Sequence, residues 1–188
     1  MKKIAVFASG SGSNFQAIID AIQGGALNAE VALLVCDKRE AFAIERAKKN
    51  NVKVFQFLPK NYENKQAFET EILQKLKELN IEWIALAGYM RLIGETLLKA
   101  YEGRIINIHP SLLPSFPGKD AIEQAYEAKV KVTGVTIHYV DEGMDTGPII
   151  AQAPIFIEET DTVDVVRTKI QEIEHKLYPE VLQKLLNE

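Results

Sequence analysis

The stretch NIHPSLLP, residues 107–114, holds residue types that acid–base chemistry needs. It follows the apolar pair Ile105–Ile106, which indicates a buried strand. Because side chains alternate between the faces of a strand, Asn107 and His109 are expected on one face at its end. An amide donates hydrogen bonds and an imidazole titrates near neutral pH. This strand end is therefore either a polar loop edge or half of an active site.

Asp145, in the turn-rich segment DEGMDTGP, is the candidate partner of His109. A carboxylate beside an imidazole orients the ring and stabilises its charged form, which suits proton transfer near neutral pH. An ordinary hairpin turn uses the same residue types, so both interpretations stay open on the residues alone. Of the other histidines, His138 in an alternating strand is expected to be partly buried and structural, and His175 is expected on a solvated helix face. Spacing excludes a calcium loop, and so few His and Cys residues give little support to zinc, so no metal is expected.

The first turn, SGSGSN at residues 9–14, separates an apolar run from an amphipathic one. Glycines permit tight geometry, and free amides at the start of a helix attract an anion. The dinucleotide fingerprint is excluded because Phe15 stands at its third glycine position, and a P-loop because no Gly-Lys-Ser/Thr follows. A phosphate site without NAD is favoured over a merely well-capped turn.

A further segment, AGYMRLI at residues 87–93, follows the fourth predicted strand. Open α/β sheets bind ligands at the carboxyl ends of their strands, where this segment is expected. It could line a pocket for a flat heterocycle, or it could be a helix packed against the sheet.

Two periodicities alternate in the first half of the chain. Short apolar runs predict strands at residues 3–8, 31–36, 52–57, 81–87 and 104–108. Amphipathic stretches predict helices at residues 15–23, 41–49, 63–79 and 94–100. After residue 110 we expect a short helix at 119–128, antiparallel strands at 131–140 and 149–157, and a helix at 161–186 that Pro179 kinks or breaks. The predicted fold class is α/β: a doubly wound, mostly parallel sheet with helices on both faces and an antiparallel C-terminal addition.

The composition suits a single domain with its own core, because 47% of the 188 residues are hydrophobic. The net charge is -4 and the Lys and Arg residues are scattered, so nucleic acid is not an expected partner. The lone Cys36 lies in an apolar run, which indicates a buried thiol and a cytoplasmic protein. The apolar run at residues 4–8 is too short for a secretion signal, and no run approaches the ~20 residues that span a membrane.

In their order and spacing, SGSGSN, AGYMRLI, NIHPSLLPSFPG and DEGMDTGPII resemble the glycinamide ribonucleotide formyltransferases over nearly the whole chain. HPSLLP is shared by the wider family of folate-dependent formyltransferases. The serine-glycine-asparagine loop narrows the resemblance to the members of that family that act in purine biosynthesis. It implies a formyltransferase-type Rossmann-like fold and an enzyme of purine biosynthesis. This enzyme would transfer the formyl group of 10-formyltetrahydrofolate to the amine of glycinamide ribonucleotide without a metal or redox cofactor. One domain, residues 1–188, would have a ribonucleotide-binding half (1–110) and a folate-binding and capping half (111–188).

The resemblance also implies roles for particular residues. The catalytic trio would be Asn107, His109 and Asp145. The ribonucleotide would be held by Gly12, Ser13 and Asn14, with Glu174 on the last helix. The folate would contact Lys65, Met90, Arg91, Leu92, Ile93, Asn107, Asp141, Glu142, Gly143, Met144 and Asp145. Lys65 departs from the arginine that some relatives have near the folate tail, although either cation could meet a carboxylate.

Other functions remain open beside this one. A formyltetrahydrofolate hydrolase shares the trio and fold but usually has an extra N-terminal domain, whereas the first strand here is expected to begin at residue 3. Methionyl-tRNA formyltransferases have a further C-terminal domain that is not expected here. A nucleotide-binding module would use only the first loop and leave the trio unexplained. The oligomeric state, monomer or homodimer, is not predicted.

Overall fold

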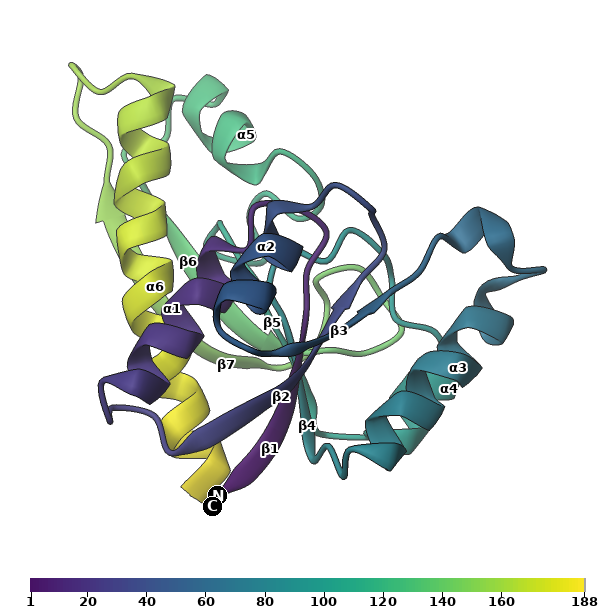
Figure 1. Cartoon of the computed structure of the whole chain (residues 1–188). Coiled ribbons are helices and arrows are strands. Elements are labelled where there is room, and N and C mark those ends of the chain that lie inside the picture. The colour runs from purple at the N-terminus through teal and green to yellow at the C-terminus, as the bar shows by residue number, and fades with distance from the viewer. Residues whose placement is uncertain (188) are drawn as a thin grey trace.

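The computed structural model describes residues 1–187, and its apolar runs form the centre of one seven-stranded sheet (Figure 1). The strands lie in the order β3-β2-β1-β4-β5-β6-β7. Five of them run parallel: β1 (Lys2–Phe7), β2 (Ala29–Cys36), β3 (Lys53–Gln56), β4 (Trp83–Leu86) and β5 (Ile105–His109). The last two, β6 (Val132–Tyr139) and β7 (Ile149–Phe156), are antiparallel. The predicted fold class is therefore confirmed.

Helices cover both faces of this sheet. One face packs against α1 (Ser13–Gln23), α2 (Phe42–Lys49), α5 (Ala121–Glu127) and α6 (Val163–Asn187). The other packs against α3 (Lys65–Glu78) and α4 (Glu95–Ala100), while a short 3₁₀ turn, η1 (Pro59–Asn61), precedes α3. Figure 1 shows α3 and α4 on one side of the sheet and α1, α2 and α6 grouped on the other. Each face has its own apolar core, because the strands between them are buried on both sides.

The strand order reverses between β1 and β4. This reversal positions the loop after β1, called the first loop below, and the loop after β4. The chain leaves β1 toward β2 and β3, then crosses back to add β4 on the other side of β1. Loops that diverge at such a reversal leave a crevice at the carboxyl ends of the strands, which is where open α/β sheets bind ligands. Here two hydrogen bonds join the loops: Ser9 N donates to Gly88 O at 3.0 Å, and Met90 N donates to Ser9 Oγ at 2.9 Å.

The structure differs from the sequence predictions at two places. Residues 87–94 form a loop, so the alternative of a helix at 87–93 is wrong. Pro179 lies inside α6 without breaking it. The adjacent Tyr178 is fully buried and donates through Oη to the backbone oxygens of Leu86 and Ile106, so packing holds the helix against the sheet across the proline.

Cys36 is buried, as predicted. Among residues 1–187, none of the helices has the length and apolar character needed to cross a bilayer.

Candidate active site

The predicted trio comes together at the end of β5. Asn107 and His109 both lie in this strand, with His109 as its last residue. Asp145 belongs to the loop between β6 and β7, and its carboxylate oxygen Oδ2 lies 3.5 Å from Nδ1 of His109. Because Val140 N bonds to Ile105 O, this loop starts beside the beginning of β5 and must turn back to bring Asp145 to His109.

His109 is buried and contacts an acceptor on each side of its ring. Its Nε2 lies 2.9 Å from the carbonyl oxygen of Phe116, and its Nδ1 faces Asp145. A carbonyl oxygen and a carboxylate accept hydrogen bonds but cannot donate them. Each ring nitrogen of His109 therefore faces an acceptor.

Asp145 is held between two imidazoles. Its Oδ1 lies 3.7 Å from Nε2 of His138, and its Oδ2 accepts a hydrogen bond from Gly118 N at 2.8 Å. Burial alone would raise the pKa of Asp145, but the interactions with His138, Gly118 and His109 together outweigh it and lower that pKa. The carboxylate is therefore ionised near neutral pH, as an orienting partner for His109 requires.

His138 contacts two residues of the trio, Asn107 and Asp145, although the sequence did not predict it as part of the site. It is buried, it pairs with Asn107 across β5 and β6, and its Nε2 lies 3.2 Å from Nδ2 of Asn107. The expectation of a structural histidine was therefore incomplete, because His138 joins Asn107 to Asp145. The pairing of β6 with β5 joins residues that are far apart in the sequence, so no local sequence pattern predicts its register.

The loop at residues 9–14 places Gly12 directly before the first turn of α1. Gly12 adopts φ +71°, and no side chain caps this helix end. The backbone N–H groups of Ser13, Asn14 and Phe15 precede the first hydrogen bond of this helix, which Gln16 N donates to Gly12 O. Free amides at a helix N-terminus attract an anion. The geometry thus suits the predicted phosphate site.

Glu174 of α6 reaches this loop from a distant part of the sequence. It accepts a hydrogen bond from Asn14 Nδ2 at 3.3 Å, and burial raises its pKa to about 7. Two nearby polar atoms, Asn14 Oδ1 and His175 Nε2, are buried without a hydrogen-bond partner in the described structure. His175 is thus partly buried, and the expectation of a solvated face was wrong.

The segment at residues 90–93 is anchored from two sides. Arg91 Nε donates to the buried Asp37 at 2.7 Å, and Lys65 Nζ donates to Leu92 O at 2.9 Å. Met90 and Leu92 remain exposed, with 63% and 45% of their surface accessible. The segment therefore offers apolar side chains near two cations, a combination that fits a flat ring with an anionic tail.

Glu69 of α3 fixes the end of this segment. Its Oε1 accepts a hydrogen bond from Gly94 N at 2.7 Å. Burial raises the pKa of Glu69, while the hydrogen bond from Gly94 opposes that rise. Neither Asp37 nor Glu69 was singled out by the sequence, because the partners of both residues lie far away along the chain.

The loop at residues 141–145 has an internal framework of hydrogen bonds. Asp141 Oδ1 accepts from Gly143 N at 3.0 Å and from Thr146 Oγ1 at 2.6 Å. Met144 is exposed, and Glu142 extends into solvent at the same turn. Val140, just before the loop, packs in the same apolar cluster as Ile93. The two predicted folate segments are therefore supported by one core.

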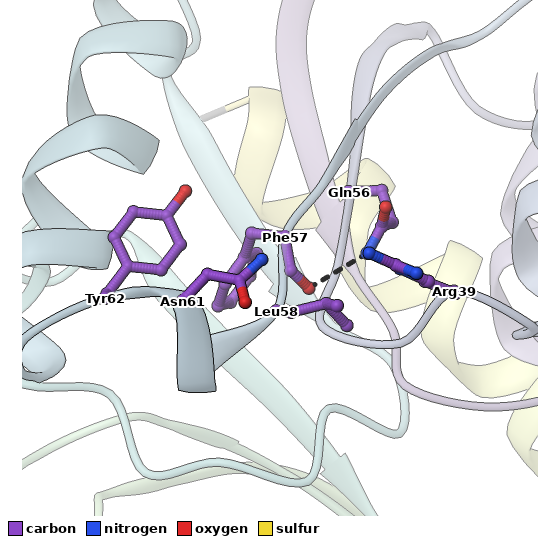
Figure 2. A pocket seen from close by; sticks show the side chains of 6 residues that line it. All are labelled: Arg39, Gln56, Phe57, Leu58, Asn61 and Tyr62. Carbon is purple, nitrogen blue, oxygen red and sulfur yellow. Dashed lines mark hydrogen bonds between the residues drawn. The ribbon is translucent and has the colours of Figure 1, made fainter.

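A separate pocket of about 270 Å³ lies beyond the ends of β2 and β3 (Figure 2). It is lined by Arg39, Gln56, Phe57, Leu58, Asn61 and Tyr62. Figure 2 shows the hydrogen bond from Gln56 Nε2 to Phe57 O across its wall. No predicted site residue lines this pocket, so it is distinct from the trio and both loops. In the part of the chain that the structure describes, no group of three or more His, Cys, Asp and Glu side chains could hold a metal ion.

Comparisons with known proteins agree with this geometry. The family model described as "Formyl transferase" matches residues 2–182. The phosphoribosylglycinamide formyltransferase of Bacillus subtilis (strain 168) is 60% identical over 186 residues, which cover 99% of this chain and 95% of that protein. The trifunctional purine biosynthetic protein adenosine-3 of Drosophila melanogaster is 38% identical over 188 residues, 99% of this chain but 14% of that protein.

Solved structures are similar over the same length. The crystal structure of glycinamide ribonucleotide transformylase 1 from Geobacillus kaustophilus has a TM-score of 0.96 and 63% identity, covering 99% of both chains. The phosphoribosylglycinamide formyltransferase from Bacillus halodurans has a TM-score of 0.96 and 60% identity, covering 100% of this chain and 96% of that one.

Proposed function

The chain belongs to the formyl transferase family, and we propose that the residues at the end of β5 transfer the formyl group of 10-formyltetrahydrofolate to the amine of glycinamide ribonucleotide. This enzyme is a transferase of purine biosynthesis. The observation that carries the residue assignment is the meeting of Asn107, His109 and Asp145 beside the two loops of the strand-order reversal.

Each ligand has a separate part of the site. The phosphate of the ribonucleotide binds the free amides of Gly12, Ser13 and Asn14, and its ribose meets Glu174. The pteridine and benzoyl rings of the folate lie against residues 90–93 and 141–145, where apolar side chains are exposed. Lys65, which holds Leu92 O, would meet a carboxylate of the folate tail, while Arg91 is paired with Asp37 and fixes the folate segment.

The chemical step needs charge stabilisation and one proton transfer. The ribonucleotide amine attacks the formyl carbon and forms a C–N bond, so negative charge develops on the formyl oxygen. Asn107 Nδ2 donates a hydrogen bond to this oxygen. The bond from the formyl carbon to folate N10 then breaks, the amine loses a proton, and N10 gains one.

His109 assists this transfer in its charged form, which the Asp145 carboxylate orients and stabilises. Asn107 Nδ2 lies 3.2 Å from His138 Nε2, and this contact holds the amide in place for the formyl oxygen.

The test is the dependence of deformylation on the acceptor. The protein is mixed with 10-formyltetrahydrofolate, and loss of the formyl group is followed with and without glycinamide ribonucleotide. Turnover only when the ribonucleotide is present supports the transferase. Equal turnover in its absence would identify a hydrolase that uses the same trio.

A further inference from the structure

Helix α2 holds the first loop through the carbonyl oxygens of two consecutive residues. Ala43 N donates to Gly10 O at 3.1 Å, and Arg46 Nε donates to Ser11 O at 2.8 Å. The next residue, Gly12, packs so closely that a Cβ atom there would lie 2.7 Å from Cβ of Ala43. Three consecutive loop residues are thus fixed against one helix.

These two hydrogen bonds set the direction of the loop amides. In a trans peptide, the N–H group points opposite to the carbonyl group of the same peptide unit. The one cis peptide bond among the described residues is Leu113–Pro114, so the peptides of the first loop are trans. Because the carbonyls of Gly10 and Ser11 face α2, the N–H groups of Ser11 and Gly12 face away from it. In Figure 1, α1 lies between α2 and α6, and Glu174 of α6 accepts a hydrogen bond from Asn14 in the first turn of α1.

Arg46 is itself held in place. Its guanidinium carbon lies 4.9 Å from the centre of the Phe42 ring, and no carboxylate among residues 1–187 forms an ion pair with it. Burial lowers the pKa of His175 on α6, and the charge of Arg46 lowers it further. The guanidinium therefore bonds to the loop, and within residues 1–187 it forms no ion pair with an acidic residue.

We propose that Arg46 is a positioning residue for the phosphate of the ribonucleotide, acting by holding the Ser11 carbonyl so that the Gly12 amide faces the phosphate. The proposal rests on the assignment of the first loop to the ribonucleotide. It adds a residue from α2, which the sequence motifs do not include. Without the side chain of Arg46, the peptide between Ser11 and Gly12 loses the hydrogen bond to its carbonyl oxygen.

The experiment compares Arg46→Ala and Arg46→Lys with the unchanged protein. For Arg46→Ala, the KM for glycinamide ribonucleotide rises about tenfold, the effect of losing one hydrogen bond from a charged donor. Both kcat and the KM for 10-formyltetrahydrofolate stay unchanged, because the trio and the folate loops lie elsewhere. Arg46→Lys recovers part of the loss, since its ammonium group can donate to the same carbonyl. Arg39→Ala is the matched control, because it removes the same charge from the pocket of Figure 2 and leaves the loop untouched.

Direct binding separates this proposal from the proposed function. Calorimetry with ribose 5-phosphate requires no formyl transfer, and its Kd rises about tenfold in Arg46→Ala if the hydrogen bond aims the loop. The ratio of the Kd of Arg46→Ala to the Kd of the unchanged protein persists at high salt, whereas an effect of charge attraction alone would be screened. An unchanged Kd, a ratio that falls to one at high salt, or an equal loss of folate affinity overturns the proposal. Failure of the proposed function would appear instead as absence of ribonucleotide formylation by the unchanged protein.

Discussion

Asp145 adopts a left-handed backbone conformation, with φ +56°, while its carboxylate lies between His109 and His138. Asp and Asn tolerate this conformation better than other side chains with a Cβ atom. Asp145→Asn therefore keeps the size and the backbone of the residue, removes the charge and replaces one acceptor oxygen by an NH2 group. The contribution of the Asp145 carboxylate to turnover can therefore be tested with this single substitution.

We expect Asp145→Asn to lower kcat while ligand affinity is mostly preserved, because the charge that stabilises a protonated His109 is lost. His109→Ala should lower kcat by ~10²–10⁴, the usual contribution of a positioned acid–base group. Residues that act as a unit do not lose rate additively, so the double variant should be barely slower than the slower single one. The measurement is kcat for the three variants, with folding checked by circular dichroism. If the two single losses multiply in the double variant, the residues act independently.

Glu174 gives a prediction of pH dependence. The ordinary pKa of 4.5 applies to the unfolded chain, and burial raises the folded value to about 7. Below pH 4.5 the side chain is protonated in both states, and its contribution to the free energy of unfolding is fully present. This contribution is lost as the pH rises through about 7, because the folded protein must then bury a charged carboxylate.

Glu174→Gln is neutral at every pH, so the stability of the natural protein relative to this variant should fall between pH 5 and 8. The fall is at most about 3 kcal/mol, since each pKa unit corresponds to about 1.4 kcal/mol. Urea unfolding at the two pH values measures it, with Glu172→Gln as the matched control because Glu172 is exposed on the same helix. A stability difference that is equal at both pH values would show that Glu174 does not titrate as its burial requires.

Among the elements, the junction of β1, the first loop and α1 depends on a single glycine. Gly12 combines φ +71° with close contact to Ala43, so a side chain there would be strained and would also push the loop from α2. Gly10, two residues earlier, has open space around its Cβ position and no such φ.

We therefore expect Gly12→Val to weaken ribonucleotide affinity strongly and to leave the affinity for a folate analogue nearly intact. Gly10→Ala, the matched control, should bind both ligands as the unchanged protein does. Calorimetry with each ligand separately checks this. An equal fall in folate affinity for Gly12→Val would mean that the loop is structural and does not bind the phosphate.

The elements also show what sequence could predict. The strands and helices follow local periodicities, and the parallel and antiparallel parts of the sheet were predicted from them. The sequence predicted a helix at 161–186 that Pro179 kinks or breaks, and it could not exclude the break, because Tyr178 holds the helix through backbone oxygens of β4 and β5. The positions of His138, Asp37 and Glu69 likewise depend on partners distant in the sequence.

In the molecule as a whole, segments that are far apart in the chain come together at the carboxyl ends of the central strands. The loops after β1 and β4 meet at the reversal of strand order, and Asp145 reaches the end of β5 from the loop after β6. The resemblance predicted a formyltransferase, and that prediction is confirmed. The roles of individual residues and the division into halves at residue 110 stay predictions, because they require bound ligands to test them.

The proposed reaction passes the formyl group to the ribonucleotide and not to water. The most direct measurement follows a ¹³C label from the formyl group of 10-formyltetrahydrofolate through one turnover with glycinamide ribonucleotide, using mass spectrometry of the products. We predict that one labelled formyl group appears on the ribonucleotide amine for each tetrahydrofolate formed, and that this transfer is slowed in the Asp145→Asn variant. Recovery of the label as formate, with the ribonucleotide unchanged, would contradict the account.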